Sequence, residues 1–138
     1  MSNQKNQKIL IIPCSGIGKS LGSVSRRATY KVIEDLRPDR ARTTCLALLT
    51  VGDEEALKLV RETPCVSIDG CPSKCAKKNI EAVEGRLVRS LMVTDVLRKH
   101  RGLKPEGVIK LNEAGEKLAS LLADEVVNEI DKIEGGER

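Results

Sequence analysis

Four of the five cysteines in this 138-residue sequence stand where short apolar segments give way to turns. Cys14 ends the first apolar segment, Cys45 lies near the end of the second, Cys71 follows the third, and Cys75 is four residues further on. If these segments are parallel strands, their carboxyl ends share the edge where α/β sheets bind ligands. Neighbouring strands are about 4.8 Å apart, and zinc holds thiolate sulfur at about 2.3 Å. Side chains from adjacent strand ends can therefore meet on one metal ion.

The pair Cys71 and Cys75 also fits the start of a helix. Pro72 suits the first position of a helix, so Cys71 is predicted to cap it and Cys75 to lie one turn later. Free N–H groups and the helix dipole at such an end favour thiolates, the form that binds metals or attacks substrates. Cys65 lies inside an apolar segment and is predicted to be a small buried hydrophobic residue. His100 stands among basic, polar neighbours and is predicted to lie on the surface.

Apolar runs and helical repeats alternate along the chain, which predicts βαβ units. Strands are expected at 8–13, 41–47, 65–69 and 87–93, and helices at 21–36, 53–63 and 72–85 and after Asn112. This order indicates a three-layer α/β/α fold with a small, mostly parallel four-stranded sheet. We expect one domain over residues 1–138, with a flexible tail at 1–7 and a charged connection plus a C-terminal helix in 98–138.

Composition restricts the possible functions. The sequence contains one Tyr and no Phe or Trp, so it has no aromatic platform on which single-stranded nucleic acid could stack. A net charge of +4 is mild, and no segment has the length of a transmembrane helix or a secretory signal. We therefore expect a cytoplasmic protein without a clear nucleic-acid or membrane partner. In that compartment a cysteine cluster is more often metal-binding or catalytic than disulfide-bonded.

The turn 13–20 reads P-C-S-G-I-G-K-S, which is close to the phosphate-binding G-x-x-x-x-G-K-[ST] loop. Pro13 occupies the place of the first glycine, fixes φ and removes an N–H, so nucleotide hydrolysis is disfavoured. Gly16 and Gly18 allow the backbone to approach a ligand closely. A small anion could bind at this turn with help from Lys19.

Three strings resemble one family: Cys14-Ser15-Gly16-Ile17-Gly18, Cys45-Leu46-Ala47, and Ile68-Asp69-Gly70-Cys71 followed by Cys75-Ala76-Lys77. Together they are similar to the DGC domain family of zinc-binding proteins, whose name matches Asp69-Gly70-Cys71 here. The resemblance runs from Cys14 to about Asp95. It implies metal ligation by Cys14, Cys45, Cys71 and Cys75, and it places Cys65 outside the ligand set.

Metal binding is accordingly the leading predicted function, with zinc as the metal and a sensing, trafficking or cofactor-assembly role. Asp69 and Gly70 are predicted beside the ligands, Asp69 as an orienting partner or as a helix-start residue, and Asp95 is predicted to border the site. An iron–sulfur cluster is an alternative because four thiolates suit iron as well. A thiol-exchange or thiol-transfer enzyme using Cys71 and Cys75 is the main rival, with a small thiol as its partner. The protein partner and the presence of enzymatic activity stay open.

Overall fold

The computed structural model describes residues 8–14, 19–70, 73–107 and 110–135 of the chain. Its centre is a four-stranded sheet in the order β2-β1-β3-β4, in which all neighbouring strands are parallel. The strands are β1 (Ile9–Pro13), β2 (Ala41–Thr43), β3 (Cys65–Asp69) and β4 (Leu87–Met92). The predicted α/β fold with a parallel four-stranded sheet is confirmed.

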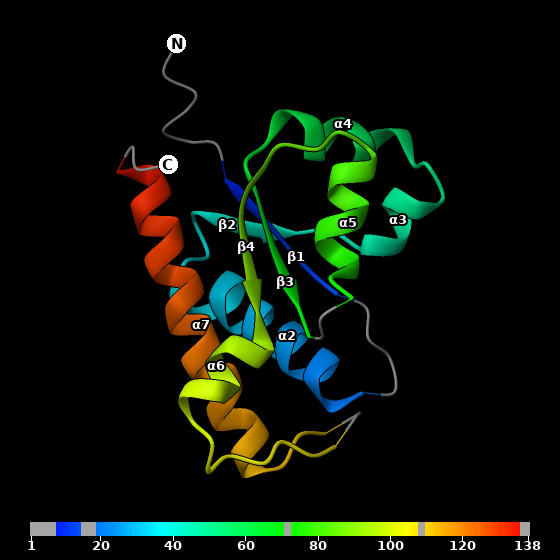
Figure 1. Cartoon of the computed structure of the whole chain (residues 1–138). Coiled ribbons are helices and arrows are strands. Elements are labelled where there is room, and N and C mark those ends of the chain that lie inside the picture. Colours follow the sequence, from blue (N-terminus) through cyan, green and yellow to red (C-terminus); the bar gives the residue numbers. More distant parts are fainter. Residues whose placement is uncertain (1–7, 15–18, 71–72, 108–109, 136–138) are drawn as a thin grey trace.

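Helices cover both faces of this sheet (Figure 1). One layer contains α2 (Ser20–Lys31), the π-helical turn η1 (Val32–Leu36), α6 (Val93–Lys99) and α7 (Glu113–Glu134). The opposite layer contains α3 (Leu46–Thr50), α4 (Glu54–Glu62) and α5 (Cys75–Ala82). The three-layer arrangement follows from the connections, because right-handed crossovers that run in opposite directions along a sheet place their helices on opposite faces.

Alternate residues of each central strand enter different cores. Ile9 and Ile11 pack with α2 and α7, whereas Leu10 and Ile12 pack with the layer of α3, α4 and α5. All four side chains are at most 2% exposed. Burial on both faces explains why β1 is a continuous apolar run without polar alternation.

Three predicted elements have boundaries that differ from those in the structure. The second strand ends at Thr43 instead of residue 47, because Leu46 and Leu49 lie three residues apart on one face of α3 and become buried there. The helix after β3 begins at Cys75 instead of Pro72. The fourth strand ends at Met92 instead of residue 93. The residues that follow it form α6, where the sequence predicted no helix.

The long C-terminal helix α7 begins where the sequence predicts it. The side chain of Asn112 accepts a hydrogen bond from the backbone N–H of Gly115 at 2.8 Å, as an N-cap residue should. One face of α7 is buried in the core that also contains Ile9 and Ile11. No helix among the described residues has the length and apolar character needed to cross a membrane.

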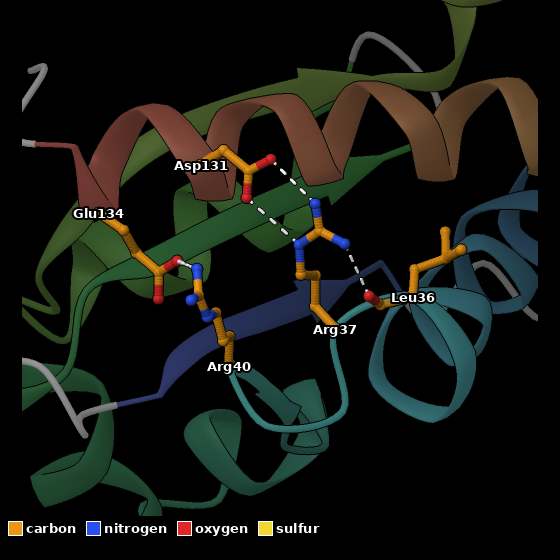
Figure 2. Close-up of polar contacts among 5 residues, drawn as sticks. All are labelled: Leu36, Arg37, Arg40, Asp131 and Glu134. Atoms are coloured by element: carbon orange, nitrogen blue, oxygen red, sulfur yellow. Dashed lines mark hydrogen bonds and ion pairs between the residues drawn. The ribbon is translucent and has the colours of Figure 1, made fainter.

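Ion pairs attach the C-terminal end of α7 to the segment between η1 and β2 (Figure 2). Arg37 donates two hydrogen bonds to the Asp131 carboxylate, at 3.2 and 3.0 Å, and Arg40 pairs with Glu134. The Arg37 guanidinium lowers the pKa of the Asp131 carboxyl through this hydrogen bond. Because the Arg37 and Asp131 side chains are partly exposed, the pair contributes at most about 1 kcal/mol. Apolar burial is therefore the main force that holds α7 in place.

Candidate metal centre

The strand order reverses direction between β1 and β3. From β1 the chain leads to β2 on one side, and from β2 it crosses back to β3 on the other side of β1. In sheets of this kind the crevice beyond the carboxyl ends of the two strands at the reversal is the usual ligand site. Cys14 follows β1, and Gly70 follows β3. The two residues therefore stand directly at the reversal point.

Cys14 is tied to the end of β3 by its backbone and by its side chain. Its N–H donates to the Ile68 carbonyl at 2.8 Å, and its Sγ accepts the N–H of Gly70 at 3.2 Å. The Sγ also lies 3.5 Å from the Ser25 hydroxyl of α2. The residue is only 7% exposed. The sulfur at the end of β1 is therefore buried and already accepts a backbone hydrogen bond.

Gly70 is held tightly against the first turn of α2. A Cβ at this position would lie 3.1 Å from the Leu21 carbonyl carbon and 3.2 Å from the Gly22 nitrogen. Both atoms belong to the backbone, which cannot move aside as a side-chain end can. Glycine therefore allows the end of β3 to approach α2 closely enough for its N–H to reach Cys14.

Asp69 fixes the start of α5. It is 1% exposed, and its carboxylate accepts the N–H groups of Ala76 at 2.7 Å and Lys77 at 3.1 Å. These bonds agree with the helix-start alternative for Asp69, whereas a role beside a metal stays a prediction. They also change the electrostatic argument for Cys75, because a carboxylate already uses two of the N–H groups that were expected to favour its thiolate.

Cys75 and Cys45 both stand at helix starts and are exposed. Cys75 is the first residue of α5 and follows Lys74, whose φ of 52° is in the left-handed region. Cys45 precedes the first residue of α3 and lies two residues beyond the end of β2. Cys45 therefore lies near a strand end, as predicted, but it is followed by α3 and is not part of the strand.

The remaining predicted site residues divide into two groups. Cys71, Gly16 and Gly18 lie outside the described residues. Lys19 caps α2 on the exposed surface, and Asp95 is an exposed residue of α6 that pairs with Arg98 at 3.5 Å. Asp95 lines a cavity of about 380 Å³ between β4, α6 and α7, and none of the four described cysteines lines it. Within residues 8–14, 19–70, 73–107 and 110–135, no three His, Cys, Asp or Glu side chains are grouped to hold an ion.

Ser25 is the contact that sequence reasoning missed. It lies 11 residues after Cys14 on the buried face of α2, in a stretch of small residues that reads as helix packing. No local pattern distinguishes it from Ser23 or Thr29. Only the packing of α2 against the end of β1 brings its hydroxyl to the sulfur.

Cys65 is buried, as predicted, and it differs chemically from the other described cysteines. It is 0% exposed, and its thiol donates towards the carbonyls of Thr63 at 3.2 Å and Val60 at 3.5 Å. Burial raises the pKa of the Cys65 thiol from 9.0 to about 12. In the metal-free folded protein at pH 8, iodoacetamide should therefore modify Cys45 and Cys75 and spare Cys65. Peptide mapping of the alkylated protein checks this, and fast modification of Cys65 would contradict it.

The raised pKa of Cys65 also predicts how stability depends on pH. Below pH 9 the thiol is protonated in both states, and its contribution to stability is complete. Between pH 9 and 12 the unfolded thiol loses its proton while the buried thiol keeps it, so stability falls by up to about 1.4 kcal/mol per pH unit. Urea unfolding of the wild type and Cys65→Ser at pH 8, 9.5 and 10.5 measures the effect. The serine variant should show the shallower fall, and equal slopes would contradict the prediction.

A family model identifies the chain. The model of the DGC domain matches residues 10–114, which is more than half of the sequence. The chain therefore belongs to the DGC domain family, as the cysteine strings indicated. Comparison with curated proteins and with solved structures gave no significant match. The matched region begins in β1 and ends in the first turn of α7, so most of α7 lies beyond it.

Proposed function

We propose that this protein binds a zinc ion through Cys14, Cys45, Cys71 and Cys75 at the carboxyl edge of its sheet. The observation that carries the proposal is the 3.2 Å hydrogen bond from the Gly70 N–H to the Cys14 sulfur at the strand-order reversal. Backbone N–H groups directed at sulfur stabilise metal-bound thiolates. A set of cysteine sulfurs also has the donor chemistry that zinc prefers.

The described residues fit such an ion only in part. Cys14 is buried and accepts a hydrogen bond, but Cys45 and Cys75 are exposed at the starts of two different helices. The proposal therefore requires Cys71, together with movement of Cys45 and Cys75 towards Cys14. Zinc held by four thiolates would tie the ends of β1, β2 and β3 together and stabilise the folded state.

The position of Asp69 supports metal binding over thiol exchange. A nucleophilic cysteine at the start of α5 would depend on free backbone N–H groups at that helix end. Two of these groups are bonded to the Asp69 carboxylate. A metal ion supplies positive charge of its own and does not depend on the helix end.

Metal analysis of protein purified without oxygen tests the proposal. We expect about one zinc per chain, no visible colour and protected thiols. Cys14→Ser and Cys71→Ser should lose most of the metal. Cys65→Ser is the matched control and should keep it, because a serine hydroxyl can still donate to the Thr63 carbonyl.

Two other results would replace the proposal. Iron with sulfide and visible absorption would make the site an iron–sulfur centre. A metal-free protein in which Cys71 and Cys75 oxidise as a pair would make it a dithiol enzyme.

A further inference from the structure

We infer that Ser25 positions the Cys14 sulfur for metal ligation, through the contact between its buried hydroxyl and that sulfur. This inference rests on the proposed metal site. Ser25 would be a positioning residue, because it acts on the metal only through the sulfur of Cys14.

Two contacts place the Ser25 hydroxyl beside the sulfur. It is buried and donates to the Gly22 carbonyl at 2.7 Å. It also lies 3.5 Å from the Cys14 sulfur, in a contact where either atom can be the donor.

A sulfur that ligates a metal can only accept hydrogen bonds. Rotation of the Ser25 hydroxyl from the Gly22 carbonyl to the sulfur would give that sulfur a second donor beside the Gly70 N–H. The Gly22 carbonyl still accepts the N–H four residues later in α2, so the rotation leaves no helix carbonyl without a partner.

The Ser25 hydroxyl lies within reach of both the Gly22 carbonyl and the Cys14 sulfur, in a buried and closely packed site. Ser25 is 0% exposed and Cys14 is 7% exposed, so water does not readily replace either contact. The close approach of Gly70 to Leu21 and Gly22 fixes the first turn of α2 beside the ends of β1 and β3. Ser25 follows on the next turn and is held facing the sulfur.

The test compares Ser25→Ala with Thr29→Ala, using Co²⁺ as the spectroscopic probe for zinc in the full-length protein. Thr29 is a matched control because its buried hydroxyl donates to the Ser25 carbonyl at 2.9 Å in the same helix, one turn beyond Ser25. Affinity is measured by competition with a chelator, and the sulfur-to-cobalt charge-transfer band is recorded. Thermal melts without metal confirm that both variants are folded.

Ser25→Ala should bind Co²⁺ about 10- to 100-fold more weakly than the wild type. Its charge-transfer band should move to lower energy, because a thiolate with fewer hydrogen bonds is easier to oxidise. Thr29→Ala should keep the wild-type affinity and band. If Ser25→Ala keeps both while the wild type binds Co²⁺ through thiolates, the role of Ser25 is overturned and the metal site stands. If the wild type shows no thiolate–cobalt band, both proposals fall.

Discussion

Replacing Gly70 by alanine is expected to lower the free energy of unfolding by about 1–3 kcal/mol and to weaken metal binding by about 10-fold or more. The added methyl group would lie 3.1–3.2 Å from the backbone of Leu21 and Gly22. Either α2 or the end of β3 must move to relieve this contact. The same movement takes the Gly70 N–H away from the Cys14 sulfur, which it reaches at 3.2 Å.

Urea unfolding of the metal-free protein measures the loss of stability separately from the loss of metal affinity. Gly102→Ala is the matched control, because a Cβ at Gly102 meets no atom within 4 Å and its φ is not in the positive range. That variant should differ from the wild type by less than about 0.5 kcal/mol. A Gly70→Ala protein with wild-type stability and wild-type metal affinity would show that the end of β3 adjusts without loss, contrary to the geometry.

Replacing Leu122 by alanine is expected to cost about 2–5 kcal/mol of folding stability while the folded protein keeps its metal stoichiometry. Leu122 is 0% exposed in the core between α7 and the sheet, where Leu118 and Val126 lie one turn away on either side. Removing a buried leucine side chain loses its transfer free energy and leaves a cavity that close-packed neighbours fill only in part.

Ser120→Ala, on the exposed side of the same helix, is the control for Leu122→Ala. It should change stability by less than about 0.5 kcal/mol. Both variants are measured by denaturant unfolding and by metal analysis. A small loss for Leu122→Ala would mean that α7 contributes little to the core. The expected large loss would show that the folding unit extends past residue 114, where the match to the family model ends.

The core elements could be predicted from the sequence because their signals are local. The continuous aliphatic run of β1 and the apolar stripe of α7 result from burial, which dictates residue type at each position. Asp53 and Asn112 were recognisable helix starts, and their side chains accept the expected hydrogen bonds from Ala56 and Gly115. Cys65 could be set apart from the other cysteines because it belongs to a strand and does not lie at a strand's carboxyl end.

Other boundaries depended on contacts between distant segments. Pro72 is a favourable first helical residue, yet α5 starts at Cys75, where the Asp69 carboxylate accepts the N–H groups of Ala76 and Lys77. The segment from Val93 becomes α6 because Val93 and Val96 can be buried against the same core as α7. Short segments have weak intrinsic preferences, so tertiary packing decides their structure.

The candidate site shows the same division. By itself the sequence determined which residue types are available, since cysteines beyond the ends of successive parallel strands must come to one edge of the sheet. Only the tertiary structure brought Gly70 and Ser25 to the Cys14 sulfur, across 56 and 11 residues respectively. A backbone N–H is present at nearly every residue, and serine is common on helices, so neither has a sequence signature. Their role arises from the close packing of α2 against the ends of β1 and β3, which depends on the shape of the whole fold.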